Sequence, residues 1–445
     1  MNRNKKIRWL LAGTVLTLAA PATAEGTPDV AAEVTALRGE VEALRARLAQ
    51  VEGAATAAPA PAAEERANVR FAGAPEITAP GGWSFKPFGR LQYDVGSVSR
   101  PDGIADPGLG FSNELRRGRI GLEGEVPGGF GYKFELDFAG ETVEITDAII
   151  TYEASDSVGL TVGQHNNFQS LEELTSSRFT SFIERAAFTD AFNFERRVGL
   201  SASFKSGPLL VQAGAFTDNI HDLDEDANDS VGLDGRVVVA PRLGDTQLHF
   251  GASAHWRDLG DLTALGMTTR YRQRPLIHST DVRFVGTPAL PVESETHYGL
   301  EAAIVRGPFH AAAEAHWLEA DTLTPGLSPT LFGGYVEAGW FLTGESRGYR
   351  SGRFDRTRPT RAIEEGGIGA FQVNLRYDRL DLNSGAVRGG TQDGFMASLV
   401  WIPTDYVRFL INYARLNYED AVLAAAGGDR SYGVDVIGAR AQIDF

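Results

Sequence analysis

A strict alternation of apolar and polar residues runs through most of the chain, in short segments separated by glycine, proline, asparagine and aspartate. In QLHFGASAHWR (residues 247–257), Leu248, Phe250 and Trp256 fall on one face, while His249 and His255 fall on the other. Successive side chains of a β-strand point to opposite faces, so a period of two predicts strands with one apolar face. From residue 83 to the C-terminus these segments show no helical spacing, and this body is predicted to be all-β.

Strands of this kind form either a soluble sandwich or a transmembrane barrel whose apolar face meets lipid. The polar faces are frankly charged, which suits a water-filled lumen, and the chain ends on Phe445 inside an alternating segment. A barrel in lipid must pair its last strand with its first, because open edges are not tolerated there. Aromatic residues cap several apolar faces, as in interfacial aromatic girdles. These are Trp256, Trp317, Trp340 and Trp401.

The length of the body predicts the number of strands. Residues 83–445 allow about 16 strands at roughly 20–25 residues per strand with its share of turn, a size that leaves an aqueous channel. Clearly recognisable strands number nearer to about 14, and residues 258–295 fit the pattern least well. We therefore expect a 16-stranded antiparallel transmembrane barrel and leave the pairing of residues 258–295 open.

The N-terminus has the features of a secretory signal peptide. Arg3, Lys5, Lys6 and Arg8 precede an apolar run over residues 9–20, and the small-residue sequence ATA ends at Ala24. The run is too short to cross a bilayer as a helix, so residues 1–24 are predicted to be removed after export. The alternative is an uncleaved anchor.

Charge and composition exclude several classes of protein. The formal charge is −16, and loss of residues 1–24, with four basic residues and no acidic ones, makes it −20. A chain this acidic is not a bulk nucleic-acid binder. The sequence contains no cysteine, which excludes disulfides and cysteine-ligated metals.

A heptad repeat follows the signal peptide, within residues 25–53. Its apolar positions are separated alternately by four and three residues, which predicts a short self-associating coiled coil in the periplasm. The alternative is an amphipathic helix that lies on its own protein. The apolar positions are Val30, Val34, Leu37, Val41, Leu44, Leu48 and Val51. Residues 54–82 begin with an Ala/Pro-rich stretch without a period and are predicted to be a linker.

The body resembles the phosphate-selective porins O and P. The resemblance covers residues 85–445 in order and rests on segments such as FKPFGRLQYD, NELRRGRIGLEGEVPGGFGYKFELDFAG and VWIPTDYVRFLINYARLNY. Its most specific marks are SLEELTSS, which begins at Ser170, and FLTGE, which begins at Phe341. The resemblance implies a trimeric, 16-stranded outer-membrane barrel whose third loop folds into the lumen, and an N-terminal coiled coil is common in such proteins.

The segment SLEELTSSRFTSFIERAAF lies in the predicted third loop, residues 166–194. A loop of this length between strands usually has a function, and a loop folded into a pore supplies the constriction that selectivity requires.

The resemblance also implies which residues surround a permeating anion. Arginine suits phosphate because its planar fork bonds two oxygens at once. The family pattern places Arg116, Arg117, Ser176, Ser177 and Arg185 around the ion, and gives Asp147 a hydrogen bond from a protonated phosphate oxygen. Arg119, which shares a strand face with Arg117, and Arg178, which follows the two serines, complete the set. The predicted site is Arg116, Arg117, Arg119, Asp147, Ser176, Ser177, Arg178 and Arg185.

Some details of this site stay open. Strict alternation places Arg116 outside the barrel, and both Arg116 and Arg117 can face the lumen only near a β-bulge or the end of the strand. Glu172 and Glu173 stand where phosphate-selective relatives carry a lysine. Any of the arginines can instead be paired with an acid that rigidifies the wall. A second basic group, within residues 270–283, forms either a row of arginines that leads anions to the constriction or an ordinary solvated edge or loop. It comprises Arg270, Arg272, Arg274 and Arg283.

Other motifs point to no cofactor and no enzyme. The acidic run over residues 218–230 imitates the start of a calcium loop, but Ala227 and Leu233 occupy the required glycine and glutamate positions. The run is either a solvated loop or a weak cation bridge to lipopolysaccharide. The sequence contains neither H-E-x-x-H nor G-x-S-x-G.

These observations predict a trimeric porin in the outer membrane of a Gram-negative bacterium, surrounded by lipid and lipopolysaccharide. It would pass small anions, phosphate or pyrophosphate foremost, by passive diffusion. The alternatives are a weakly selective porin and a mainly structural envelope barrel.

Overall fold

The computed structural model of the protein describes residues 30–57, 67–223, 229–260 and 266–445. The chain divides into two units, residues 1–65 and 66–445, and each is described by itself. The predicted signal peptide lies outside the described residues. Within the described ranges, no helix is both long enough and apolar enough to cross a membrane.

The first unit contains helix α1 (Val30–Ala57). Its heptad positions are uncovered: Leu37 is 55% exposed and Leu44 is 64% exposed. The segment expected to form a coiled coil is therefore helical, and its association with other helices stays a prediction.

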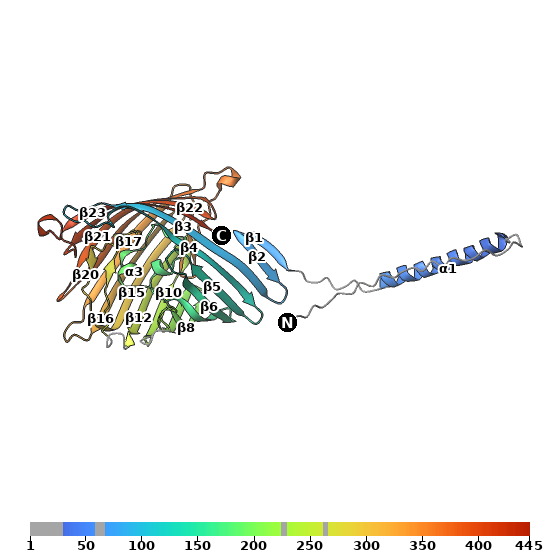
Figure 1. Ribbon diagram of the computed structural model, residues 1–445, viewed down its shortest axis with the longest axis horizontal. Coiled ribbons are helices and arrows are strands. Elements are labelled where there is room, and N and C mark those ends of the chain that lie inside the picture. The colour runs from blue at the N-terminus through green and yellow to red at the C-terminus, as the bar shows by residue number, and fades with distance from the viewer. Residues whose placement is uncertain (1–29, 58–66, 224–228, 261–265) are drawn as a thin grey trace, which may run out of the picture. The chain divides into compact units, whose positions relative to one another are not determined.

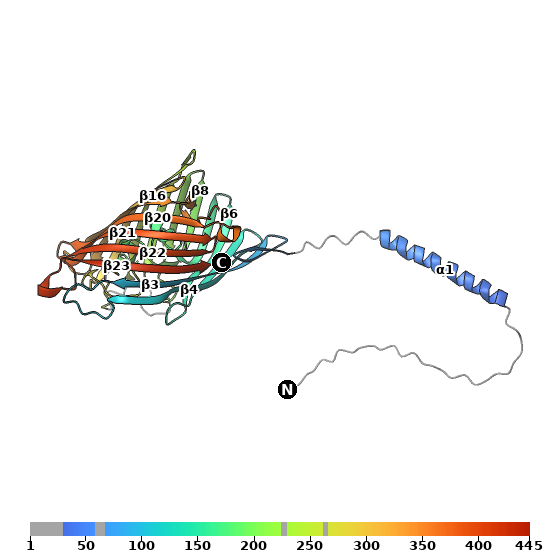
Figure 2. The same cartoon turned by 90° about the horizontal axis from the view of Figure 1, so that it is seen from above.

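The second unit is a closed barrel of sixteen antiparallel strands (Figures 1 and 2). Each strand pairs with the next along the chain, and the last pairs with the first from Val436↔Val98 to Asp444↔Arg90. This confirms the predicted 16-stranded barrel. The strands are β3 (Trp83–Val98), β4 (Gly110–Val126), β5 (Phe130–Asp137), β6 (Glu144–Ser155), β7 (Val158–Asn166), β8 (Arg196–Ser206), β9 (Leu209–Phe216), β10 (Val231–Val239), β12 (Thr246–Asp258), β15 (Val292–Arg306), β16 (Phe309–Thr322), β17 (Thr330–Phe341), β20 (Ala370–Ser384), β21 (Val387–Thr404), β22 (Val407–Glu419) and β23 (Tyr432–Asp444).

The C-terminal residue takes part in the closure. The backbone N–H of Gly89 donates to the carbonyl of Phe445 at 3.0 Å, and the N–H of Phe445 donates to the carbonyl of Gly89 at 3.0 Å. The last strand is thus hydrogen-bonded to β3 up to its final residue.

A short hairpin corrects the predicted linker. β1 (Asn68–Ala72) pairs with β2 (Ala74–Ala79), and β2 extends the sheet by pairing with β3 from Ile77↔Phe85 to Ala79↔Trp83. Residues 68–79, expected to be linker, therefore belong to the barrel unit. The segment NVRFAGAPEITA was overlooked because its single proline and three alanines hide a weak alternation.

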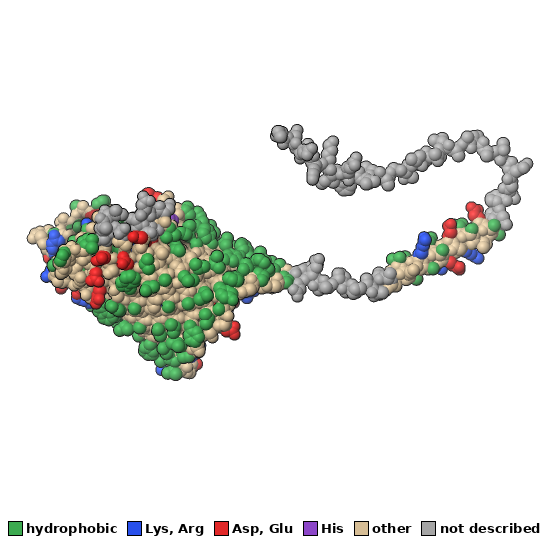
Figure 3. Space-filling model, turned by 90° about the horizontal axis from the view of Figure 1, so that it is seen from below, with side chains coloured by type: hydrophobic (Ala, Val, Ile, Leu, Met, Phe, Trp, Pro, Cys, Tyr) green, Lys and Arg blue, Asp and Glu red, His purple; other side chains and the backbone are tan. Residues whose placement is uncertain are grey.

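The two faces of the wall have the polarity of a membrane barrel. Leu300, Leu375 and Ile411 point outward and are more than half exposed, whereas Arg236 and Glu301 are buried on the inner side. Hydrophobic side chains cover much of the visible outer wall (Figure 3). A soluble sandwich would bury the first set and expose the second.

The two ends of the barrel differ in the lengths of their connections. At one end the turns are short, such as residues 127–129 and 307–308, and at the other the loops include residues 167–195 and 259–291. Short turns mark the periplasmic end. The exception is a long periplasmic connection, residues 342–369, which holds six arginines and is termed the periplasmic arginine segment.

The remaining elements lie in connections. Residues 258–295, the poorest fit in the sequence, contain the end of β12, the start of β15 and a long loop with a small two-stranded sheet. The connections contain α2 (Leu171–Leu174), α3 (Ala187–Ala191), β11 (Arg242–Leu243), β13 (Arg272–Gln273), β14 (Val285–Gly286), β18 (Gly348–Arg350), β19 (Arg353–Asp355), η2 (Ile363–Glu365) and η3 (Ala426–Gly428).

Candidate functional site

The loop of residues 167–195, here the lumenal loop, lies against inward-facing side chains of the wall. At its beginning, the N–H groups of Leu171 and Glu172 donate to the carboxylate of Glu314 on β16, at 2.9 and 2.7 Å. Ser170 precedes α2 with a φ of 66° and accepts a hydrogen bond from the N–H of Glu173. A wall carboxylate therefore satisfies the free amides that begin this helical turn.

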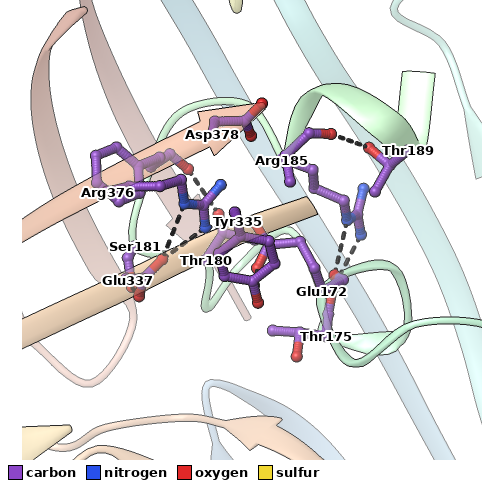
Figure 4. A network of polar contacts seen from close by, with 12 residues as sticks. Glu172, Thr175, Thr180, Ser181, Arg185, Thr189, Tyr335, Glu337, Arg376 and Asp378 are labelled. Atoms are coloured by element: carbon purple, nitrogen blue, oxygen red, sulfur yellow. Dashed lines mark hydrogen bonds and ion pairs between the residues drawn. The ribbon is translucent and has the colours of Figure 1, made fainter. Parts of the chain in front are cut away.

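Arg376 on β20 anchors the same turn (Figure 4). Its Nη2 lies 2.8 Å from Oε1 of Glu172 and 2.6 Å from Oε2 of Glu337. The guanidinium lies between the rings of Phe182 and Tyr335, at 4.6 and 4.4 Å from their centroids. Glu172 is 1% exposed and thus faces the wall rather than open space.

The second half of the loop is held by aromatic and polar contacts. Phe188 of α3 stacks on His316 at 4.3 Å between ring centroids. The N–H of Ala187 donates to Asp378 at 3.0 Å. The loop is thus attached to β16 and β20 along its length.

Glu184 joins the loop to the opposite part of the wall. It accepts two hydrogen bonds from Arg116 at 2.9 and 3.2 Å and lies 3.1 Å from Arg440. Burial alone would raise the pKa of Glu184, but the charges of Arg116 and Arg440 lower this pKa well below its ordinary value. The carboxylate is therefore ionised and bridges loop and wall.

Two cavities adjoin the lumenal loop inside the barrel. The periplasmic cavity has a volume of ≈ 370 Å³ and is lined in part by Arg350 and Arg353 of the periplasmic arginine segment. The extracellular cavity has a volume of ≈ 260 Å³ and is lined in part by Arg274 and His278 of loop 259–291. Four residues line both cavities and so mark the boundary between them. They are Arg117, Arg119, Glu173 and Arg185.

A β-bulge in β4 turns two consecutive arginines inward. The register with β3 shifts at Arg116, between the pairs Gln92↔Arg117 and Tyr93↔Leu115. Arg117 is 6% exposed and donates to Oε1 of Gln92 at 3.0 Å. Within the described ranges Arg117 forms no ion pair, whereas Arg116 and Arg119 each have carboxylate partners. Arg117 is thus a buried arginine with no carboxylate at ion-pair distance in the part of the chain that the structure describes.

Arg119 and Asp147 belong to ion-pair networks on the periplasmic side. Arg119 bonds Asp137 at 2.7 Å. Asp147 accepts from Lys133 at 2.6 Å and from Arg196 at 2.9 Å. Of these five residues, all but Asp137 line the periplasmic cavity.

The predicted loop residues Ser176, Ser177, Arg178 and Arg185 also line the periplasmic cavity, and they differ in their hydrogen-bond partners. Ser177 accepts a hydrogen bond from Arg90 at 3.0 Å, and Ser176 accepts one from Arg178 at 3.2 Å. Arg185 donates to the backbone carbonyls of Glu172, Glu173 and Thr175 at 2.9 to 3.1 Å. Arg185 therefore caps the short helix α2 as well as facing both cavities.

Sequence reasoning missed several cavity residues. Arg90 shares the polar face of its strand with Gln92, so alternation was an available signal. The periplasmic arginine segment was overlooked although its arginine spacing is conspicuous. Phe354 of this segment donates its N–H to the hydroxyl of Thr175, at 3.3 Å, so it contacts the lumenal loop. The missed basic residues of the cavity are Arg90, Lys133, Arg196, Arg236, Arg350 and Arg353.

The second basic group does not form one strand face. Arg272 lies on β13 in loop 259–291, and Arg274 pairs with Asp190 and Asp281 at 3.4 and 3.0 Å. Only Arg274 of this group lines the extracellular cavity. The acidic run is partly outside the described residues, and the described ranges hold no group of three or more His, Asp or Glu suited to a metal.

Comparison with known proteins assigns the family. The model of the phosphate-selective porin O and P family matches residues 85–445. The chain belongs to this family. It is therefore a porin of the outer membrane, and family and fold indicate a channel rather than an enzyme.

Relatives of this porin cover most of its length. It is 48% identical over 458 residues to an uncharacterized protein of Caulobacter vibrioides. The aligned region covers 94% of this chain and 91% of the relative. It is 28% identical over 338 residues to porin O of Pseudomonas aeruginosa, across 69% of this chain and 75% of the relative.

Solved porins share the fold. An anion-selective porin from Comamonas acidovorans matches with a TM-score of 0.52 at 12% identity, over 82% of this chain and all of that one. OmpT of Vibrio cholerae matches with a TM-score of 0.51 at 11% identity, over 83% of this chain and all of that one. At such identities the likeness concerns the barrel architecture alone.

Proposed function

We propose that this porin conducts small anions by passive diffusion, with phosphate-type ions preferred, through a constriction at the boundary of the two cavities. The observation that carries the proposal is Arg117, a buried guanidinium that faces both cavities without an ion-pair partner in the described ranges. A permeating anion would supply the missing negative charge.

The charge of the cavity wall supports anion passage. Ten arginine and lysine residues line the periplasmic cavity, against three aspartate and glutamate residues. This local excess is opposite in sign to the net charge of −16 for the chain. A pore's local potential decides which ions enter it, so the acidity of the whole protein does not oppose the proposal.

Phosphate fits the chemistry of the wall. Arg117, Arg119 and Arg185 at the boundary offer planar guanidinium donors, and Asp147 can accept a hydrogen bond from a protonated phosphate oxygen. Their distribution over two cavities favours a track of weak sites, which a conducting pore requires. In the membrane we propose a homotrimer surrounded by lipid and lipopolysaccharide; a solved form of OmpT from Vibrio cholerae is a trimer.

Conductance in planar bilayers tests the proposal. In a KCl gradient the reversal potential should report preference for chloride over potassium, and millimolar phosphate should reduce the chloride current. Anion preference without block by phosphate would leave a general anion porin and refute the phosphate assignment. Absence of any conductance by the reconstituted barrel would favour a structural envelope protein instead.

A further inference from the structure

The outer wall of the barrel contains a cavity of ≈ 430 Å³, here the outer furrow, which crosses β15, β16, β17 and β20. These four strands are neighbours in the sheet (Figure 1). Ala313 and Ala315 of β16 line the furrow, and Ala315 is paired with Gly334 of β17. Leu300 and Val336 also line it and are 55% and 59% exposed, so the furrow opens to the outside of the barrel.

The outer furrow lies within the lipid-facing band, toward its extracellular side. Phe332 lines its extracellular end and packs against Trp317, with 5.5 Å between the ring centroids. At the periplasmic end of the same strands, next to the turn of residues 307–308, Phe309 packs against Trp340 at 6.3 Å. Aromatic residues of a membrane barrel mark the two interfaces of the bilayer. The furrow therefore extends from the middle of the bilayer to its extracellular interface.

The chemistry of the outer furrow suits a hydrocarbon chain. A hollow in a lipid-facing wall deprives the atoms around it of dispersion contacts, and a close-fitting chain restores these contacts. The outward-facing polar residues of the lining, Tyr377 and Arg379, are both engaged by Asp393. The hydroxyl of Tyr377 donates to it at 2.5 Å, and Arg379 lies 2.8 Å from it. The furrow thus offers apolar contact along its length, while the charge at its mouth is already paired.

The wall behind the outer furrow holds the anchor of the lumenal loop. Glu314, which accepts the two backbone N–H groups that begin this loop, is the residue between Ala313 and Ala315. Tyr335, whose hydroxyl donates to Glu314 at 3.0 Å, follows Gly334. The wall is a single sheet, so the residues that line the furrow and the residues that hold the loop share one backbone. A chain that packs into the furrow restrains this backbone and, through it, the loop.

We propose that the outer furrow binds one acyl chain of lipopolysaccharide, and that this chain steadies the anchor of the lumenal loop. Lipopolysaccharide occupies the outer leaflet, and its acyl chains run from the extracellular interface to the middle of the membrane, which is the extent of the furrow. The effect on the pore rests on the proposed constriction, whereas binding of the chain does not.

Native mass spectrometry of the full-length porin, extracted from outer membranes in mild detergent, tests the binding. The furrow variant, Ala313→Leu with Ala315→Leu, fills the cavity with its own side chains. The wild type should retain one lipopolysaccharide molecule per chain that the furrow variant loses. The matched control, Ala252→Leu with Ala254→Leu, changes two exposed alanines at the same spacing on β12, and it should retain the wild-type number.

Three outcomes of this experiment would overturn the proposal. Equal retention by the three proteins would show that the furrow binds no lipopolysaccharide. Retention of a phospholipid, lost in the furrow variant, would assign the furrow to another lipid. Loss of oligomers in the furrow variant alone would show that a second copy of the chain covers the furrow.

The current noise of single channels tests the effect on the lumenal loop. In phospholipid bilayers, added lipopolysaccharide should lower the noise of the wild type and of the control. The furrow variant should be equally quiet with and without lipopolysaccharide, because its leucines replace the chain. Wild-type noise that does not respond to lipopolysaccharide, or an equal response in the furrow variant, would refute the link to the loop. The reversal potential reports anion preference separately, and lipid retention needs no conduction, so failure of the proposed function is recognised independently.

Discussion

Substitution of Arg117 by glutamine should change the ion selectivity of the pore more than any other single loss of a wall charge. A sphere with the volume of the periplasmic cavity, ≈ 370 Å³, is about 9 Å across, so an ion inside it stays within roughly 8 Å of a wall guanidinium. At an effective dielectric constant of about 20, a unit charge at 8 Å changes the energy of the ion by about 2 kcal/mol. Screening at 0.1 M salt reduces this to about 0.9 kcal/mol.

This energy corresponds to roughly a fivefold change in local ion concentration. Because anions are depleted and cations enriched by the same factor, the permeability ratio of chloride to potassium should fall by roughly 20-fold in Arg117→Gln. The assay is the reversal potential across a KCl gradient at low salt. The substitution removes chiefly the hydrogen bond that Arg117 donates to Gln92, so the barrel should fold normally.

The matched control is Arg379→Gln. Arg379 lies on the outer wall, where its Nη1 is 2.8 Å from Asp393, and its replacement changes the formal charge by the same amount. The control should keep the wild-type reversal potential. A ratio within about twofold of wild type in Arg117→Gln, or an equal shift in the control, would refute the reasoning.

Four further outcomes are expected. Glu173→Gln should raise the preference for anions in the same KCl gradient, because Glu173 lines both cavities, and an unchanged reversal potential would contradict its placement. Glu172→Gln should leave the reversal potential nearly unchanged, since the carboxylate is buried against Arg376. Arg376→Met should destabilise the barrel by about 3 kcal/mol in urea unfolding, because it leaves the buried carboxylate of Glu172 without its arginine partner and leaves Glu337 with Arg347 alone. A destabilisation below about 1 kcal/mol would argue against this anchor. The pKa of Glu184 is depressed in the folded protein, so the ion pairs of this residue stabilise the lumenal loop fully above about pH 4.3 and less as the pH falls below that value. Single-channel current noise should therefore be constant from neutral pH to about pH 4.5 and rise below it. The Glu184→Gln variant should show the higher noise at every pH.

The barrel was predictable because a lipid-facing strand imposes a pattern on every second residue. The alternation in residues 247–257 corresponds to β12, and the alternating C-terminal segment corresponds to β23, which closes the sheet. The hairpin at residues 68–79 was missed because only three of its residue pairs join β3, too few to need a strong pattern. The structure of loop 259–291 could not be predicted because its small sheet has two residues in each strand, too few to show an alternating pattern.

The site was predictable in its residues more than in its contacts. Arg116 and Arg117 both point inward because of a bulge, an irregularity that the sequence allows but does not require. Arg185 finds three carbonyl acceptors because α2 is a single helical turn, and the free carbonyl groups at its end lie beside the Arg185 guanidinium. Such contacts depend on the fold of a loop, for which period-two reasoning has no rule.

Glu172 and Glu173 show why adjacent identical residues cannot be assigned from sequence. Successive residues of a helix point about 100° apart, so a single turn directs one acid to the wall and the next to the lumen. Which acid faces the wall is decided by Glu314 and Arg376, which are 142 and 204 residues from Glu172 in the chain. Glu172 is neutralised there, and Glu173 lies beside Arg185 at 3.4 Å. The boundary between the cavities therefore holds one acid among three arginines rather than two unpaired acids, which removes the electrostatic objection that the sequence raises against anion passage.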